Sequence, residues 1–152
     1  MTATLGYWKI RGLGQPIRLL LEYLGLEYTE EKYEPGPAPE FNKDCWLSKK
    51  YEIGLDYPQL PYYKDEDVIL TQSHTINQYI AQTNGMGGKD AKQRAILSMI
   101  YGAIDDIRGE FTRMCYNSDF EKLKPGFLDS LPARLRVFEN NLQKHEWISG
   151  DQ

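Results

Sequence analysis

The sequence predicts an α/β domain followed by an all-helical domain. Segments with the alternating pattern of β-strands and a segment with helical spacing follow one another in the first half of the chain. A glycine-rich stretch at 84–88 interrupts this order, and the apolar repeats beyond it have the spacing of amphipathic helices. We therefore expect domains over residues 1–84 and 90–152, joined by a linker at 85–89.

Residues 2–10 have the composition of a short β-strand. Leu5 and Tyr7 alternate with Gly6 and Trp8, so the two pairs fall on opposite faces of the strand. By position alone, Tyr7 is an ordinary half-buried strand aromatic.

A helix is expected after this strand. Pro16 stands where the first helical turn tolerates a missing N–H group, an apolar stripe follows, and Gly25 ends the pattern. Arg18 and Glu22 lie one turn apart on this helix. Residues 28–33 are typical of a second strand, so the order strand, helix, strand predicts a parallel pair.

A proline-rich stretch at 34–39 predicts a long surface loop instead of regular structure. Residues 44–51 then have the pattern of a short helix that carries Trp46. Two interpretations of this segment stay open. It is either an aromatic and lysine clamp for an anionic, peptide-like ligand, or a tryptophan that covers the core beside solvated charges.

Residues 58–81 predict a strand, a turn, a second strand and a helix, and the rest of the chain is organised around them. Prolines, including Pro61, remove backbone donors, so the backbone at Leu60 can face a ligand instead of a strand. The helix start suits a carboxylate or phosphate. The alternative is that Thr71 or Ser73 simply caps the helix.

The helical half contains two long amphipathic repeats, over 90–116 and 120–142. Pro125 and Pro132 predict bends or restarts in the second repeat. The two helices are expected to form an antiparallel hairpin, followed by a turn-like segment at 147–152.

Composition excludes several classes of protein. With 41% apolar and 12% aromatic residues among 152, the chain can bury a core, and a formal charge of −4 without a basic block argues against a nucleic-acid partner. No apolar run reaches the roughly 20 residues that cross a bilayer, and no signal peptide is recognised, so a cytoplasmic protein without a membrane partner is expected. Cys45 and Cys115 lie outside any metal-ligand spacing, and two histidines make a His-based centre improbable, so no metal site is predicted.

Four motifs resemble the mu class of glutathione S-transferases at matching spacing, and the likeness runs through essentially the whole chain. They are LGYWKIRGL at 5–13, QLPY at 59–62, LTQS at 70–73 and CYN at 115–117. The resemblance implies an α/β thioredoxin-like N-terminal domain with a cis peptide bond before Pro61, and an all-α C-terminal domain.

The same resemblance implies a reaction. Glutathione is the co-substrate and brings its own thiol, so no permanently bound cofactor is expected. Tyr7 would donate a hydrogen bond to the sulfur and favour thiolate over thiol. Each unit by which the thiol pKa falls corresponds to about 1.4 kcal/mol. The thiolate would then attack a small hydrophobic electrophile, as in detoxification.

Glutathione contacts also follow from the resemblance. Gln72 and Ser73 would hold the γ-glutamyl end at the helix start, and Leu60 would pair with the cysteinyl backbone. Trp8, Trp46 and Lys50 would contact the glycyl end. The positions are Tyr7, Trp8, Lys43, Trp46, Lys50, Gln59, Leu60, Pro61, Gln72, Ser73 and Asp106. Lys43 and Gln59 stand where mu enzymes often have Arg and Asn, and a lysine cannot make the planar two-pronged contact with a carboxylate.

A homodimer and an electrophile site are implied in the same way. Tyr57 would be an aromatic key inserted into the partner, and Asp106 would reach glutathione across the dimer interface, although by pattern alone it is an exposed helix acid. The electrophile site would be bordered by Arg11, Gly12, Leu13 and Tyr116.

One departure from the family concerns length. Its members continue past the point equivalent to residue 151 into further helices, so the expected glutathione transferase fold is C-terminally incomplete. The glutathione site lies almost entirely in the residues present, and the electrophile site lies there only in part. The sequence therefore supports glutathione recognition better than turnover.

The sequence leaves three alternatives to the transferase. A structural or glutathione-binding protein without the reaction, like the lens crystallins derived from this family, would be retained on immobilised glutathione without turnover. An inactive truncated fragment would fail to bind glutathione. A prostaglandin isomerase of the sigma class fits less well, because the proline-rich loop and the Gly-Tyr-Trp start are mu-like.

Overall fold

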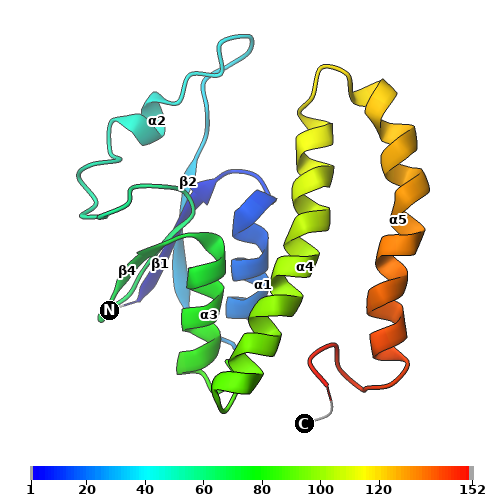
Figure 1. Ribbon diagram of the computed structural model, residues 1–152. Coiled ribbons are helices and arrows are strands. Elements are labelled where there is room, and N and C mark those ends of the chain that lie inside the picture. Colours follow the sequence, from blue (N-terminus) through cyan, green and yellow to red (C-terminus); the bar gives the residue numbers. More distant parts are fainter. Residues whose placement is uncertain (1, 151–152) are drawn as a thin grey trace. The chain divides into compact units, whose positions relative to one another are not determined.

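The computed structural model describes residues 2–150 and divides into two compact units, Met1–Gly87 and Gly88–Gln152 (Figure 1). The first unit contains a four-stranded sheet with helices, and the second is a helical hairpin. The outermost positions of the two expected domains, residues 1 and 151–152, lie outside the described residues. Within the described range, none of the helices has both the length and the apolar character that spanning a membrane requires.

Strands β1 (Ala3–Trp8), β2 (Tyr28–Tyr33), β3 (Tyr62–Lys64) and β4 (Ile69–Thr71) form one mixed sheet in the order β2-β1-β3-β4. Strand β2 runs parallel to β1, and helix α1 (Gln15–Tyr23) connects them. Strand β3 is antiparallel to both of its neighbours. The structure thus confirms the predicted parallel pair and the predicted hairpin.

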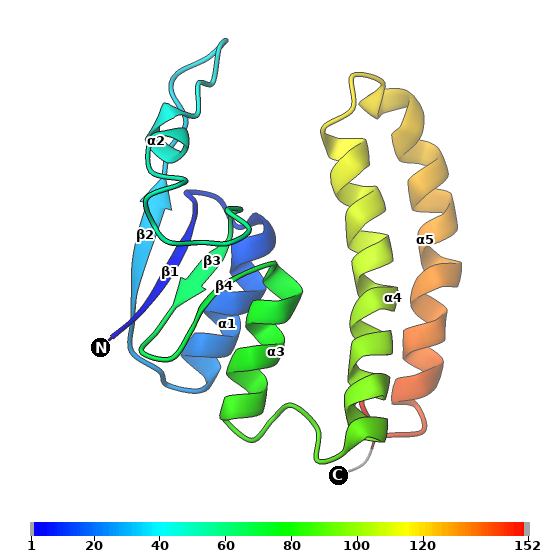
Figure 2. The same ribbon diagram turned by 60° about the vertical axis from the view of Figure 1, so that its left-hand side comes forward.

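Alternation along the strands gives the sheet two different faces. Helices α1 and α3 (Ser73–Thr83) cover one face (Figure 2). The core on that face consists of six buried side chains: Leu5, Ile17, Leu21, Tyr63, Ile76 and Ile80. The opposite face carries three buried aromatic side chains, which we call the aromatic cluster: Tyr33, Trp46 and Tyr62. Trp46 belongs to the one-turn helix α2 (Asp44–Leu47), which is shorter than the predicted 44–51.

The end of α1 follows the sequence signal, and the two charged residues one turn apart on this helix bond to other partners. Gly25 has a φ of 65° immediately after the C-cap residue, a conformation that glycine adopts without a steric penalty. Arg18 bonds to Glu30 of β2 instead of Glu22, and Glu22 accepts the hydroxyl of Tyr28 at 3.2 Å. The strand offers Arg18 a partly buried partner, which a solvent-exposed pair one helical turn away cannot match.

The start of α3 differs from the predicted cap. The helix begins at Ser73, the N-cap residue Gln72 has a φ of 69°, and no side chain makes a capping hydrogen bond. The expectation that Thr71 or Ser73 caps this helix is therefore wrong. A side chain normally caps a helix when the N-cap residue has an extended backbone. The backbone of Gln72 is left-handed instead.

The second unit is the predicted antiparallel hairpin, made of α4 (Ala91–Cys115) and α5 (Phe120–Leu142). The N-cap residue Asp90 accepts the backbone N–H of Gln93 at 2.8 Å, which satisfies one of the free donors of the first turn. A short connection between the helices leaves them as neighbours along their length (Figure 1).

Helix α5 contains both Pro125 and Pro132 without a restart. Each proline removes one N–H donor, which leaves the carbonyl four residues earlier without its helical partner. Those carbonyls belong to Glu121 and Leu128, both exposed residues, so water can satisfy them. The predicted restarts are therefore absent, and the helix continues through both prolines although each removes one hydrogen bond.

The turn between β3 and β4 is organised by Asp65. Its Oδ1 accepts the backbone N–H groups of Asp67 and Val68, each at 2.9 Å. Burial alone would raise the pKa of the Asp65 carboxyl, but these N–H groups and the phenols of Tyr79 and Tyr63 together hold the pKa below its ordinary value.

Replacing Gly6 with alanine should destabilise the first unit. An added Cβ would lie 2.0 Å from Cε1 of Tyr62, so the ring or the strand must move. We expect the free energy of unfolding to fall by about 1–3 kcal/mol, as for other overpacked sites. Urea unfolding measures the change. Gly102→Ala is the control, because nothing lies within 4 Å of its new Cβ; equal stability of Gly6→Ala and the parent would contradict the prediction.

Asp65→Asn should lose stability in a pH-dependent way. A lowered folded-state pKa means that the carboxylate stabilises the fold above its unfolded pKa of about 3.9 and loses this effect as the pH falls through the folded value. The difference in unfolding free energy between parent and variant should therefore be present at pH 7 and shrink in acid. Asp67→Asn, which keeps the backbone donor to Asp65, is the control. A difference that stays constant from pH 7 to the acid range would refute this account.

Candidate functional site

Tyr7 lies at the end of β1 beside the loop that follows the strand. Its side chain is 5% exposed, and its hydroxyl oxygen accepts the backbone N–H of Leu13 at 2.9 Å. Within residues 2–150 this is the hydroxyl's one hydrogen bond, so its hydrogen stays available to an acceptor. The N–H donor also polarises the phenol and strengthens the bond that the phenol can donate.

Two glycines let the loop approach Tyr7 closely. A Cβ on Gly12 would lie 2.6 Å from the Tyr7 hydroxyl oxygen, and a Cβ on Gly14 would lie 2.6 Å from its Cδ1 atom. Gly12 also has a φ of +37°, which residues with side chains rarely adopt. The Tyr7 side chain can therefore occupy this position only because residues 12 and 14 have no Cβ atom.

Arg18 ties the loop to the sheet. Its Nε donates to Glu30 at 2.7 Å, and its Nη1 donates to the carbonyl of Ile10 at 2.9 Å and to that of Arg11 at 3.4 Å. The guanidinium also lies 6.0 Å from the centre of the Tyr7 ring, within the range of a cation–π contact. Arg18 thus holds the backbone segment from which Leu13 reaches the Tyr7 hydroxyl.

The sheet register brings further predicted residues to the same end as Tyr7. Gly6 pairs with Tyr62, and Tyr62 pairs with Thr71, both antiparallel. Continued by one residue, this register places Tyr7, Pro61 and Gln72 level with one another. The peptide bond between Leu60 and Pro61 is cis, which confirms the expectation, and β3 begins only at Tyr62. The backbone of Leu60 therefore lies outside the ladder, as a ligand-facing segment requires.

The first turn of α3 adjoins this end of the sheet. No side-chain cap occupies its N–H groups, and the left-handed conformation of Gln72 is one that non-glycine residues seldom adopt. Such backbone strain costs roughly 1–3 kcal/mol and occurs often at ligand-binding positions. With the capping alternative removed, this helix start is free to meet an anionic group.

The aromatic cluster brings together the residues predicted for the other end of the ligand. Trp46 is 5% exposed and lies against Tyr62 with ring centroids 6.3 Å apart and an interplanar angle of 21°. Trp8 and Leu60 pack on the same cluster. Burial and the neighbouring hydroxyl and carboxyl groups raise the pKa of Tyr62, and burial raises the pKa of Tyr33 to about 12, so both phenols stay protonated at neutral pH.

The other predicted residues are mostly accessible. Lys50 lies over the ring of Tyr51, 5.4 Å from its centre, and Ser73 is half-buried at the start of α3. Tyr57 is 77% exposed and Tyr116 81% exposed. The remaining exposed positions are Arg11, Gly12, Leu13, Lys43, Gln59 and Asp106.

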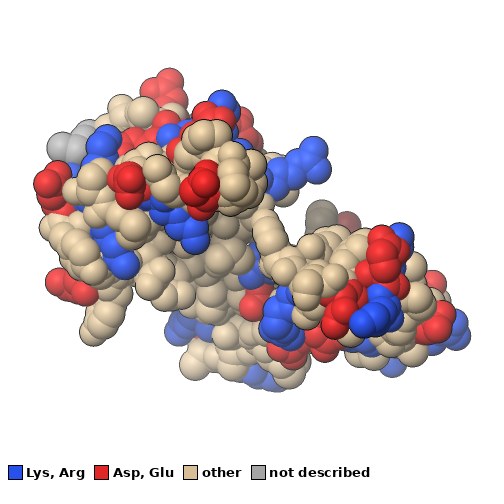
Figure 3. Space-filling model, turned by 90° about the horizontal axis from the view of Figure 1, so that it is seen from above, with Lys and Arg blue, Asp and Glu red and all other residues tan. Residues whose placement is uncertain are grey.

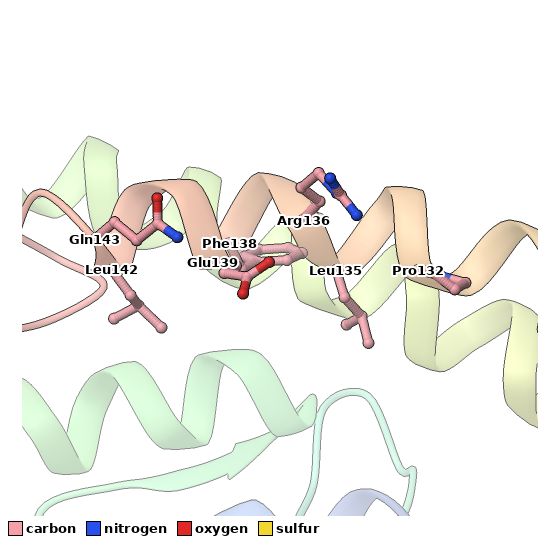
Figure 4. A pocket seen from close by; sticks show the side chains of 7 residues that line it. All are labelled: Pro132, Leu135, Arg136, Phe138, Glu139, Leu142 and Gln143. Atoms are coloured by element: carbon pink, nitrogen blue, oxygen red, sulfur yellow. The ribbon is translucent and has the colours of Figure 1, made fainter.

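The second unit has an open hollow along one side of α5 (Figure 4). It is lined by Pro132, Leu135, Arg136, Phe138, Glu139, Leu142 and Gln143. None of these positions was predicted as a site residue, and the lining has no group of catalytic side chains. The described residues also contain no cluster of three or more His, Cys, Asp or Glu side chains that could hold a metal ion. On the face in Figure 3, acidic and basic side chains are interspersed.

Two polar groups beside the site were missed by the sequence analysis. Arg18 was considered only with Glu22, and Glu31 was not considered, although it accepts hydrogen bonds from two buried tyrosines. Both interactions join different elements of the chain, so no local spacing indicates them. Gly6 was the local signal that could have indicated the contact between Glu31 and Tyr62, because a glycine within a strand often marks the close approach of another group.

Comparisons with known proteins place these features in a family. The model of the glutathione S-transferase N-terminal domain matches residues 3–82. A class-mu 26 kDa glutathione S-transferase isozyme from Schistosoma mansoni is 49% identical over 100% of this chain and 75% of its own length. Glutathione S-transferase 2 from Gallus gallus is 45% identical over 100% of this chain and 69% of its own. The crystal structure of the glutathione S-transferase Blo t 8 has a TM-score of 0.87 at 34% identity, covering 98% of this chain and 69% of that one.

Arg18→Lys should destabilise the first unit more than the loss of a surface ion pair. A lysine cannot reproduce the simultaneous contacts with Glu30 and two backbone carbonyls, so we expect a loss of about 1–3 kcal/mol in unfolding free energy. Lys9→Ala is the control, because Lys9 and Glu34 form an exposed pair, worth at most about 1 kcal/mol. Chemical denaturation followed by circular dichroism compares them, and equal losses would count against the role of Arg18.

Proposed function

The chain belongs to the mu class of the glutathione S-transferase family, and we propose that it joins the thiolate of glutathione to small hydrophobic electrophiles. The observation that carries the proposal is the Tyr7 hydroxyl, whose oxygen accepts the Leu13 N–H and whose hydrogen is left for a ligand. We assign glutathione binding to the first unit. The helical unit then contributes to electrophile binding and to the dimer.

Tyr7 is the catalytic residue in this proposal. Its hydroxyl donates to the glutathione sulfur, and because this bond is stronger to the thiolate than to the thiol, it lowers the pKa of the thiol. The thiol proton passes to solvent, the thiolate forms a bond with the electrophilic carbon, and the leaving group departs with its electron pair. The Leu13 N–H supports the proposal because it orients the phenol without using its hydrogen.

Glutathione would lie along the end of the sheet. The γ-glutamyl carboxylate meets the first turn of α3 at Gln72 and Ser73, and the cysteinyl backbone pairs with Leu60 before Pro61. The uncapped helix start and the place of Leu60 before the first residue of β3 support these assignments. We assign the glycyl carboxylate to Trp8, Trp46 and Lys50, and include Lys43 and Gln59 as further glutathione contacts. The lysines supply positive charge there without the two-pronged geometry of arginine.

The remaining roles concern the electrophile and the assembly. We assign the electrophile site to Arg11, Gly12, Leu13 and Tyr116, with Tyr116 donating a hydrogen bond to the reacting substrate. We further propose a cytoplasmic homodimer in which Tyr57 inserts into the partner and Asp106 reaches glutathione across the interface. The exposure of both side chains in a single chain supports their availability for such contacts. Glutathione enters as a co-substrate and no cofactor is bound permanently.

Tyr7→Phe should lower the conjugation rate at neutral pH. A hydrogen bond to a charged group contributes about 1.5–3 kcal/mol, so kcat/KM should fall roughly 10- to 150-fold. The acid limb of its pH profile should also move toward the ordinary thiol pKa of about 8.5. Conjugation of an aryl halide, followed by absorbance across this pH range, measures both effects.

Tyr23→Phe is the matched control, since Tyr23 is 76% exposed and lies at the end of α1. The control should keep the parent's rate and pH profile. If Tyr7→Phe also kept them, the catalytic role of Tyr7 would be excluded. If the parent itself did not exceed the reaction in buffer, the transferase function of the chain would be excluded.

A further inference from the structure

One carboxylate oxygen on β2 accepts hydrogen bonds from two buried phenols. The Tyr33 hydroxyl donates to Oε2 of Glu31 at 2.9 Å, and the Tyr62 hydroxyl donates to the same atom at 2.8 Å. The two hydroxyl oxygens lie 3.3 Å apart. Tyr33 and Tyr62 are only 4% and 2% exposed, and buried hydroxyl groups are normally hydrogen-bonded, so the exposed Glu31 supplies an acceptor to two phenols that lie almost entirely inside the protein.

The sheet is built to allow this contact. Gly6 of β1 pairs with Glu31 on one side and with Tyr62 on the other, so the three residues form a row across the sheet. The Tyr62 ring lies over Gly6, where a Cβ would come within 2.0 Å of it. The phenol can therefore cross β1 and reach a side chain two strands away.

The same two phenols support helix α2. Trp46 packs edge-on against Tyr33, with ring centroids 5.2 Å apart, and stacks on Tyr62. A four-residue helix has no independent stability, because one turn does not repay the cost of helix nucleation. The position of α2 therefore depends on the packing of Trp46, the one buried side chain of this helix.

Two further side chains pack against the aromatic cluster. Trp8 lies against Tyr33 with ring centroids 6.4 Å apart and an interplanar angle of 77°, and Leu60 packs against the aromatic cluster. Because burial keeps both tyrosines protonated at neutral pH, each remains a donor that needs an acceptor. Glu31 is the charged acceptor that both share, and hydrogen bonds to a charged group are stronger than neutral ones.

We propose that Glu31 is a positioning residue for glutathione binding, because it fixes the aromatic cluster against which the ligand-contacting side chains pack. The inference rests on the proposed function, which assigns glutathione contacts to Trp8, Trp46 and Leu60. Glu31 acts through these residues and does not touch the reacting atoms. Tyr7 faces the opposite side of the sheet and is held by Leu13 and Arg18, so its position does not depend on Glu31.

Glu31→Ala tests the inference by separating binding from chemistry. We expect the KM for glutathione to rise about tenfold, which corresponds to about 1.4 kcal/mol. At saturating glutathione, kcat and the KM for an aryl halide should stay at the parent's values, because Tyr7 is undisturbed. Glu31→Gln should restore most of the affinity, since its amide oxygen can still accept both phenols. Glu27→Ala, which removes an equal charge from an exposed position outside these contacts, is the control.

A second measurement does not require glutathione. In proteins that also carry Trp147→Phe, the fluorescence reports only Trp8 and Trp46. Acrylamide should quench this fluorescence more strongly in Glu31→Ala than in Glu31→Gln or in Glu27→Ala. This comparison detects release of the aromatic cluster even if Glu31→Ala is less stable than the parent.

The outcomes separate the inference from the proposed function. If the parent conjugates glutathione and Glu31→Ala has the parent's KM and quenching, the positioning role is wrong and the transferase function stands. If Glu31→Gln is as impaired as Glu31→Ala, or if kcat falls as much as affinity, the positioning role is also wrong. If neither the parent nor Glu27→Ala binds glutathione or conjugates it, the proposed function fails, and the role assigned to Glu31 in binding fails with it.

Discussion

The antiparallel register of β1 and β3 is the constraint on which the site depends. With Gly6 opposite Tyr62, Tyr7 is level with Pro61 at the end of the sheet where α3 begins. A slip of one residue would send each side chain of the moving strand to the other face. The paired residues Leu5 and Tyr63 oppose such a slip, because both are buried in the core beneath α1 and α3.

This register lets one strand serve two tasks. Tyr7 points to the helix-covered face, where Leu13 bonds to its hydroxyl and Arg18 lies over its ring. Trp8, the next residue, points to the other face and packs on the aromatic cluster. Alternation in a strand thus places the group that we propose for the chemistry and the group that we propose for binding on opposite faces. A change on one face can then alter affinity while leaving the chemical step intact.

Features with a local signal were predictable from the sequence. Pro16 and Gly25 marked the limits of α1, and the parallel β2 followed from the order of elements. The local pattern was insufficient where tertiary contacts decided the partners. A left-handed Gln72 took the place of a side-chain cap on α3, and Arg18 bonded across to a strand instead of along its own helix. Each replacement lies beside the end of the sheet to which we assign glutathione.

The sequence by itself determined the order of the elements, the division near the glycine-rich stretch and, through its motifs, the family. Periodicity and turn chemistry are local, so they can be read along the chain. Only the tertiary structure decided which partners the polar groups have, since the contacts of Tyr7 with Leu13 and of Glu31 with Tyr62 depend on how separate segments meet. Tyr62 lies 31 positions from Glu31 in the sequence. The two residues come together because both pair with Gly6 in the sheet.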